Sequence, residues 1–238
     1  MRSLPHREGI PREMTPYYEQ DGITIYHGDC RELLPSLRAD MLITDPPYGV
    51  NLGTSDRRGG SHGLAKGAYA SSVDSYDRWL ELVPPAIGAA LLATNGRGAV
   101  FTGKHVIDYP RPEVVGGVYV PAAAGRNEWG YTNLITVFFY GVNPKLHKGS
   151  HHTVLRSSEA AEINGHPCPK PIGWMRWLVN LACAPNYIVL DSFMGSGTTL
   201  VAAKQLGYSG IGIEIEERYC EIAAKRLAQG ALPMEFSA

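Results

Sequence analysis

Cysteine is scarce in this chain of 238 residues, and its four copies are scattered. Cys30, Cys168, Cys183 and Cys220 form no Cys-x-x-Cys pair, the spacing that is typical of redox and zinc sites. Scattered cysteines are typical of reduced thiols, which persist in a cytosol and not in an oxidising compartment. We therefore expect no disulfide framework and a cytoplasmic location.

Long apolar runs are absent as well. No stretch approaches the about 20 apolar residues that a membrane helix needs, so we expect no contact with a membrane. The first residues, Met1 to Glu8, lack the apolar core of a secretory signal. With 44% hydrophobic residues the chain can bury one full α/β core. We interpret residues 1–13 as a polar extension, residues 14–232 as a single domain and residues 233–238 as a tail.

An excess of either charge is missing too. The formal net charge is −1, which excludes a protein held on nucleic acid by bulk electrostatics. The charges are unevenly distributed, however. Residues 140–158 contain no acidic side chain, and residues 49–73 contain Asp56 alone among acids. The basic residues of these two stretches are Arg57, Arg58, Lys66, Lys145, Lys148 and Arg156.

The most informative motif is Asp45-Pro46-Pro47-Tyr48, which directly follows the apolar run 41–44. In open α/β sheets the chemistry lies just beyond the carboxyl ends of such buried strands. Two prolines remove two backbone donors and make the turn rigid. A carboxylate and a nearby carbonyl can accept both hydrogens of an exocyclic NH₂, while a tyrosine ring stacks on the heterocycle. The motif therefore predicts a pocket for the amino group of a base, although a plain Pro-Pro turn has the same sequence.

A second motif lies far downstream. The buried run 188–191 enters a glycine turn, Phe193-Met194-Gly195-Ser196-Gly197, and a helical pattern follows from Thr198. A strand, a glycine turn and a helix form the setting in which a ligand approaches the backbone. No lysine follows Gly197, which excludes a Walker phosphate loop, and no third glycine completes a dinucleotide fingerprint.

With both motifs present, the chain resembles the amino-directed (N6-adenine/N4-cytosine) DNA methyltransferases, which use S-adenosylmethionine. Asp45-Pro46-Pro47-Tyr48 matches the catalytic motif of that family, and residues 193–197 match its cofactor motif. Three further segments are similar to family motifs: Gly28-Asp29-Cys30, His166-Pro167-Cys168-Pro169-Lys170-Pro171, and Gly212-Ile213-Glu214 with Tyr219 beyond it. The order, with the catalytic motif first, resembles the β group of the family.

The resemblance implies an α/β fold, a circularly permuted Rossmann-like methyltransferase fold with a mostly parallel seven-stranded sheet flanked by helices. The apolar pattern agrees, because strands and helices alternate. We expect strands at 23–26, 40–44, 99–102, 134–140, 188–191 and 210–214. We expect helices at 31–37, 75–92, 171–183, from 198 onward and at 216–229. Strand 134–140 should belong to an antiparallel hairpin.

The resemblance also implies the roles of individual residues. The catalytic set is Asp45, Pro46, Pro47 and Tyr48, acting on a flipped base by direct in-line methyl transfer. The cofactor set is Asp29, Lys170, Asp191, Phe193, Gly195, Ser196, Gly197, Thr198, Thr199 and Glu214. Of these, Glu214 would hold the ribose hydroxyls, Asp191 the methionine amino group, and Lys170 the methionine carboxylate.

DNA is the partner that this reading requires. Residues of about 49–73 are interpreted as a DNA-facing loop, and residues of about 104–165 as hairpin strands with a small target-recognition region. The six basic residues named above are the candidate DNA contacts, although solvated loops would have the same composition. By analogy with relatives we expect a homodimer, a cognate restriction endonuclease, and a bacterial, archaeal or phage-infected host cell.

Several alternatives stay open at this point. Family members that methylate N4 of cytosine more often carry serine in place of Asp45, which favours adenine. A catalytically idle DNA-binding subunit is a further alternative, but such chains generally lose the carboxylate or a cofactor glycine. Pro167-Cys168 is the dipeptide of C5-cytosine methyltransferases, yet those enzymes have no Asp-Pro-Pro-Tyr turn, so we interpret Cys168 as structural. A metal cluster at His147, His151 and His152 lacks acidic or cysteine partners, and we expect no metal.

Overall fold

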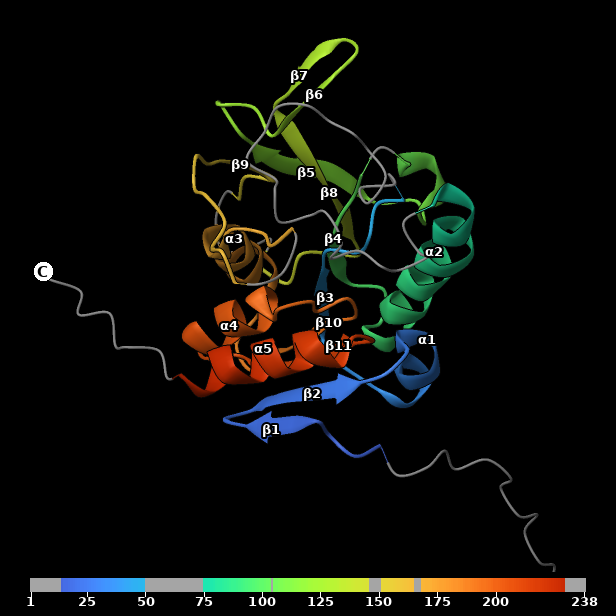
Figure 1. Ribbon diagram of the computed structural model, residues 1–238, viewed down its shortest axis with the longest axis vertical. Coiled ribbons are helices and arrows are strands. Elements are labelled where there is room, and N and C mark those ends of the chain that lie inside the picture. The colour runs from blue at the N-terminus through green and yellow to red at the C-terminus, as the bar shows by residue number, and fades with distance from the viewer. Residues whose placement is uncertain (1–13, 50–74, 104, 146–150, 165–167, 230–238) are drawn as a thin grey trace, which may run out of the picture.

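The computed structural model describes residues 14–49, 75–103, 105–145, 151–164 and 168–229. Within them one nine-stranded mixed sheet crosses the molecule, with helices on both faces (Figure 1). The strands of this sheet are β1 (Tyr18–Gln20), β2 (Ile23–His27), β3 (Met41–Thr44), β4 (Gly98–Phe101), β5 (Val114–Tyr119), β8 (Leu134–Tyr140), β9 (Val154–Arg156), β10 (Ile188–Asp191) and β11 (Ser209–Glu214). A separate ribbon joins β6 (Gly125–Asn127) to β7 (Gly130–Thr132).

The spatial order of the sheet is β1-β2-β11-β10-β3-β4-β8-β5-β9. The five strands from β2 to β4 are parallel, so their carboxyl ends lie along one edge. Strand β8 is antiparallel to β4 and to β5, as the expected hairpin requires. The expectation of seven strands is wrong by two, because β1 and β9 extend the two edges of the sheet.

The helices are α1 (Cys30–Leu33), α2 (Tyr76–Ala93), α3 (Ile172–Ala182), α4 (Thr198–Gln205) and α5 (Glu217–Ala228). Two short 3-10 helices lie at Leu34–Ser36 and Val106–Asp108. Helix α2 continues through two interior prolines, and its buried Trp79, Val83 and Ile87 recur every fourth residue, the spacing of one helix face. Within the described residues no helix is long and apolar enough to cross a bilayer.

The core has two layers, one on each side of the sheet. Along β3 successive side chains point to opposite faces, as in any strand. Leu42 therefore packs with α1 and α2, whereas Met41 and Ile43 pack with α3 and α4. Helix α5 packs with α4 over β2 in a third cluster. With both faces covered, the central strands are buried throughout, as their unbroken apolar runs predict.

The expected elements are present to within a few residues of their predicted bounds. Strand β1 was not predicted, and within the expected hairpin region of about 104–165 no bounds were predicted for β5, β6, β7 and β9. These segments are short or rich in glycine, and the structure places most of them at edges of the molecule (Figure 1). Short edge strands carry too little apolar alternation to be found from sequence.

Candidate active site

A row of four carboxylates runs along the edge where the parallel strands end. Asp29 lies just after β2, Glu214 ends β11, Asp191 ends β10 and Asp45 follows β3. Because β2, β11, β10 and β3 are consecutive neighbours in the sheet, these four side chains come from adjacent positions along the edge. Their order in space differs from their order in the sequence. The structure therefore brings together carboxylates that four separate motifs supplied.

Asp45 is held by two side chains. Its Oδ1 accepts a hydrogen bond of 2.6 Å from the Tyr48 hydroxyl, and its Oδ2 lies 2.5 Å from the ammonium of Lys170. The Lys170 and Asp45 side chains are only 13% and 20% exposed, so solvent screens this ion pair weakly. The ammonium also lies over the rings of Tyr48 and Phe101, at 5.1 and 5.6 Å from their centroids. Lys170 was expected to face the cofactor, yet its observed partner is Asp45.

A layer of aromatic side chains supports the Asp45 turn. The indole Nε1 of Trp79 donates a hydrogen bond of 2.7 Å to the carbonyl of Pro47. Trp79 packs in turn against Tyr76, His105 and Tyr109. The hydrogen bond fixes the Pro47 carbonyl, and the surrounding rings hold Trp79 in place.

Asp191 is buried, with a carboxyl that links two strands. Its Oδ1 accepts the Thr44 hydroxyl of β3 at 2.7 Å and the Phe193 backbone N–H at 3.2 Å. Burial raises the pKa of Asp191 to about 6, while the hydroxyls of Thr199 and Thr44 lower it in part. No cation pairs with Asp191 among the described residues, which is why burial dominates its pKa.

Glu214 is oriented by backbone donors. Its two carboxylate oxygens accept the N–H groups of Gly195 and Glu216, both at 2.8 Å. Burial raises the pKa of Glu214 above its ordinary value, although the two N–H donors lower it in part. Each carboxylate oxygen keeps a second lone pair, so the fixed carboxylate can still accept two hydroxyl groups.

The glycine turn after β10 contains two residues with positive φ. Gly195 and Gly197 have φ values of 53° and 79°, a region that other residues rarely adopt. Gly197 precedes α4, and a Cβ there would lie 2.8 Å from the Cβ of Ala223. Ser192 in this turn is buried, and its hydroxyl has no hydrogen-bond partner among the described residues. A buried hydroxyl without a partner is the feature expected where a ligand supplies the missing bond.

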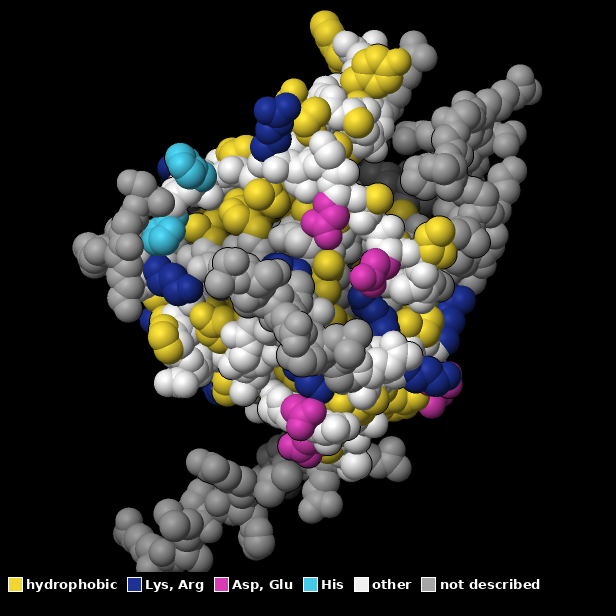
Figure 2. All heavy atoms as spheres, turned by 90° about the vertical axis from the view of Figure 1, so that its left-hand side faces the viewer, with side chains coloured by type: hydrophobic (Ala, Val, Ile, Leu, Met, Phe, Trp, Pro, Cys, Tyr) yellow, Lys and Arg dark blue, Asp and Glu magenta, His cyan; other side chains and the backbone are white. Residues whose placement is uncertain are grey.

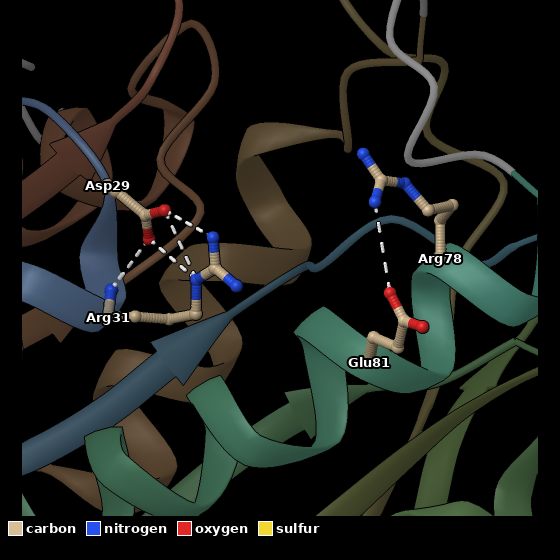
Figure 3. Close-up of polar contacts among 4 residues, drawn as sticks. All are labelled: Asp29, Arg31, Arg78 and Glu81. Atoms are coloured by element: carbon tan, nitrogen blue, oxygen red, sulfur yellow. Dashed lines mark hydrogen bonds and ion pairs between the residues drawn. The ribbon is translucent and has the colours of Figure 1, made fainter.

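The remaining cofactor candidates have partners within the protein. Asp29 caps α1 through the Arg31 N–H and pairs with the Arg31 guanidinium at 2.6 Å (Figure 3). These hydrogen bonds hold the pKa of Asp29 below its usual value. Phe193 is half-buried and packs against the α2 side of the core. Thr198 and Thr199 are buried at the start of α4.

Sequence reasoning missed three residues that hold the cofactor turn from outside. Arg226 of α5 donates to the Ser196 carbonyl at 2.6 Å and to the Thr198 hydroxyl at 3.2 Å. The same guanidinium pairs with Glu162, and Asn164 donates to the Ser196 hydroxyl. The segment before the His166 motif therefore lies against the turn. Contacts between segments so far apart in the sequence leave no local signal.

A cavity of about 260 Å³ adjoins the catalytic turn. It lies beside Tyr48 and Lys170, and Trp174 of α3 lines it. Glu159 lines it as well and accepts the Gly173 N–H at 3.0 Å, which caps the start of α3. The walls are otherwise apolar: Val120, Ala124, Ile135, Ala161, Pro169 and Pro171. An apolar cavity beside a carboxylate and an aromatic ring suits a flat heterocycle with an amino group.

The candidate DNA contacts fall into two groups. Arg57, Arg58, Lys66 and Lys148 lie outside the described residues, as does most of the predicted loop at 49–73. Arg156 is exposed at the end of edge strand β9. Lys145, in contrast, donates its ammonium to the Asn180 carbonyl of α3 at 2.8 Å. That bond anchors the segment after β8 to the last turn of the helix.

Three of the four cysteines are buried. Burial raises the pKa of the Cys30, Cys183 and Cys220 thiols to about 12, so these three are not thiolates. Cys168 is half-buried. The described residues include no cluster of three histidine, cysteine or acidic side chains that could hold a metal. His166, Pro167 and His147 lie outside the described residues.

A sequence model of the N6/N4 DNA methylase family matches residues 130–225. The YubD protein of Escherichia coli (strain K12) is 30% identical over 215 residues, covering 84% of this chain and 88% of YubD. The chain belongs to the N6/N4 DNA methylase family. The Type II methyltransferase M2.LlaDCHI of Lactococcus lactis subsp. cremoris is 27% identical over 268 residues, covering 91% of this methylase and 93% of the relative.

Solved structures agree with this assignment. The M1.HpyAVI–SAM complex superposes with a TM-score of 0.61 at 25% identity, covering 86% of this methylase and 98% of that chain. The PvuII DNA methyltransferase, which is cytosine-N4-specific, superposes with a TM-score of 0.63 at 17% identity, covering 90% and 89%. The second likeness shows the fold alone. The cofactor expected from the sequence, S-adenosylmethionine, is the cofactor of this family, and DNA is its substrate.

Proposed function

We propose that this methylase transfers a methyl group to the exocyclic N6 amino group of adenine in a short DNA site. The observation that carries the proposal is the Asp45 carboxylate, held between Tyr48 and Lys170, two residues that line an apolar cavity. Aspartate at this position favours adenine, because serine is the more frequent residue in relatives that modify cytosine. The target base must leave the duplex, since its amino group is inaccessible within a paired helix.

Asp45 and the Pro46 carbonyl then each accept a hydrogen bond from one of the two amino hydrogens. The amino nitrogen is a weak nucleophile while its lone pair is delocalised into the ring. Two acceptors at this turn draw the nitrogen toward tetrahedral geometry and free the lone pair. Asp45 also stabilises the positive charge that develops on nitrogen, in a site that is organised beforehand. Trp79 favours this arrangement, because its bond to Pro47 keeps the rigid turn in place.

Tyr48 has two functions in this proposal. Its hydroxyl orients Asp45, and its ring forms one wall of the cavity that receives the base. Stacking of a base on an aromatic ring contributes about 1–3 kcal/mol in comparable sites. Lys170 positions Asp45 in place of its expected contact with the cofactor, because its ammonium lies against Oδ2 of that carboxylate.

S-adenosylmethionine, when bound, supplies an electrophilic methyl group on a sulfonium. The residues present fit it. Asp191 and Glu214 have no cationic partner among the described residues, so their charges favour a cationic ligand. Glu214 would hold the ribose hydroxyls, Asp191 the methionine amino group, and the glycine turn would admit the ligand close to the backbone. The unpartnered Ser192 hydroxyl is a further hydrogen-bonding group there.

We also infer a circular permutation of the usual methyltransferase fold. Strand β10 and its glycine turn come late in the chain, yet β10 lies directly beside β3 in the centre of the sheet. A permutation places strands β10 and β11, with the cofactor turn, after β3 and β4 in the sequence. The order of the strands in the sheet is unchanged by it. Both halves of the sheet then still meet at one edge.

The proposal is tested with Asp45→Ala and with the modified base itself. The variant should lose more than nine tenths of its turnover on DNA, while calorimetry shows cofactor affinity within a few-fold of wild type. Mass spectrometry of nucleosides from methylated DNA should contain N6-methyladenine. N4-methylcytosine in its place would refute the adenine assignment. A wild-type chain that binds S-adenosylmethionine without modifying any DNA would instead be an idle subunit.

A further inference from the structure

Strands β6 and β7 form a two-stranded ribbon, here called the aromatic ribbon (residues 125–132), which stands apart from the main sheet. It projects beyond β5 and β8 at one end of the molecule (Figure 1). Trp129 at its turn is 99% exposed, and Tyr131 is 72% exposed. Figure 2 shows hydrophobic side chains at this projecting end. The ribbon therefore presents aromatic surface outward.

Both rings present most of their surface to solvent. Large aromatic side chains are normally buried over most of their surface, and an exposed apolar group of this size indicates a binding surface. An isolated two-stranded ribbon is also only marginally stable in water. Aromatic residues that served to stabilise it would pack against the main sheet, and an exposed fraction of 99% excludes that for Trp129.

The base of the ribbon is part of the wall of the active-site cavity. Ala124 and Ile135, which flank the ribbon in sequence, line that cavity together with Tyr48. The Ala124 N–H donates to the Thr132 carbonyl at 2.7 Å, which ties the start of the ribbon to its end. Trp129 lies five residues beyond Ala124, so an extended chain keeps it within about 18 Å of the cavity wall. One DNA duplex can therefore contact both the cavity and the aromatic tip.

The neighbouring sheet edge adds a positive charge. Tyr119 of β5 is in register with Leu134 of β8 and with Arg156 of β9, so the three side chains share one face. Tyr119 and Leu134 are 43% and 46% exposed, and Arg156 is exposed. Exposed rings beside a guanidinium are the combination that binds nucleic acid, through stacking on bases and contact with phosphates.

We propose that the aromatic ribbon contacts the DNA duplex beside the target base, with Trp129 stacking on the bases left exposed when that base leaves the helix. The inference rests on the base flipping of the proposed function. Stacking by Trp129 offsets part of the cost of unstacking the target. A second copy of the chain is a poorer occupant, because a stable interface needs about 800 Å² per partner and the ribbon presents two side chains.

The test compares two DNA duplexes that differ only opposite the target adenine. One pairs the adenine with thymine, and the other places an abasic site there, so the base is already loosened. Trp129→Ala should lower kcat/KM about 5- to 150-fold on the paired duplex, the range expected from the loss of one stacked base. On the abasic duplex the loss should be several-fold smaller. Trp129→Phe, which keeps a ring, should retain most of the activity.

Leu92→Ala provides the matched control, since Leu92 is an 81% exposed side chain on α2. This variant should have the wild-type kcat/KM on both duplexes. Calorimetry should give wild-type cofactor affinity for every variant, whereas Asp45→Ala should be inactive on both duplexes. Failure of the proposed function would therefore be visible separately. A second measurement is intrinsic fluorescence: DNA should quench tryptophan emission of the wild type, and that component should be missing from Trp129→Phe.

Two results would overturn the proposal. If Trp129→Ala lowers kcat/KM equally on both duplexes, or on neither, the ring does not substitute for the flipped base. A change in the sedimentation of the free Trp129→Ala protein, with unchanged DNA kinetics, would show that a second copy occupies the ribbon. Loss on the paired duplex alone, together with the missing fluorescence component, supports it.

Discussion

At the scale of single residues, the four carboxylates of the strand-end row are compensated differently. Asp29 pairs with Arg31, and Asp45 pairs with Lys170 (Figure 3 shows the first pair). Asp191 and Glu214 have only hydroxyl and backbone N–H donors. The pKa of Asp29 is lowered, and those of Asp191 and Glu214 are raised. The two ends of the row are thus neutralised within the protein, while its centre keeps negative charge for a cationic ligand.

Lys170→Met separates the two roles proposed for this lysine. If Lys170 positions Asp45, kcat should fall about 10- to 100-fold, because a part-buried carboxylate loses its partner, while the Kd for S-adenosylmethionine stays within about threefold. Lys170→Arg should restore part of the rate. Lys204→Met, which breaks a lysine–aspartate pair outside the site, should leave kcat unchanged. A large loss of cofactor affinity with normal kcat would show that Lys170 contacts the cofactor and does not position Asp45.

Asp191→Asn should stabilise the protein at neutral pH. The pKa of Asp191 is about 6 when folded and 3.8 in its ordinary state, so the folded protein binds more protons between these values. The free energy of unfolding therefore falls as pH rises through this window and stays lower above it. Asparagine removes the charge but keeps an acceptor for Thr44 and Phe193.

We expect a gain of about 1–3 kcal/mol at pH 7.5 and almost none at pH 4, measured by urea denaturation at both pH values. Cofactor affinity should fall in the same variant, because its carboxylate is proposed to hold the methionine amino group. Equal effects on stability at the two pH values would contradict the assigned pKa.

At the scale of elements, the turn after β3 is fixed by its neighbours as well as by its prolines. Trp79 of α2 bonds the Pro47 carbonyl, and Gly103 after β4 lies against the Tyr48 ring. The catalytic turn therefore depends on two elements that follow it in the chain. Such support keeps a site within the narrow geometry that transition-state stabilisation requires.

Gly103→Ala tests that dependence. A Cβ at Gly103 would lie 2.8 Å from the Cβ and Cγ of Tyr48, so the tyrosine must shift. Turnover should fall about tenfold, because the displaced hydroxyl orients Asp45 less well, and cofactor affinity should not change. Gly88→Ala on α2 is the control: no atom lies within 4 Å of its Cβ, and it should be neutral or stabilise by up to about 1 kcal/mol. Steady-state kinetics that do not distinguish the two variants would contradict the role of Gly103.

At the scale of the whole molecule, two halves of one sheet meet at β3. Strands β2, β11 and β10 carry the candidate cofactor residues, and β4, β8 and β5 lead to the cavity and the aromatic ribbon (Figure 1). Asp45 stands at the junction. This arrangement lets a base from one side and a methyl donor from the other reach the same carboxylate.

The recognised DNA site should be short, at most about four base pairs. Each side chain that reads a base edge contributes about 1–3 kcal/mol, so a long site needs many readers. The candidates for bidentate readout are few: Arg57, Arg58, Asn143 and Arg156. Lys145 is engaged by α3 and does not add to them. Methylome sequencing of cells expressing the chain should identify a motif of this length. Modification confined to a motif of six or more base pairs would mean that a partner does the reading.

The sequence by itself determined the family, the strand and helix succession and most of the candidate site. Asp45-Pro46-Pro47-Tyr48 and the turn at Gly195 and Gly197 are local signals, because a rigid turn and a positive φ are set by the residues present. The long apolar runs of the central strands are local as well. Each of these features could therefore be predicted before the structure was known.

Only the tertiary structure decided which of these residues act together. Lys170 meets Asp45 across 125 residues, Asp191 meets Thr44 across 147, and Arg226 reaches the cofactor turn from the last helix. The order of strands in a sheet is a matter of packing among distant segments, and no local pattern encodes it. The same holds for the aromatic ribbon, because the exposure of Trp129 depends on how the ribbon is placed relative to the main sheet.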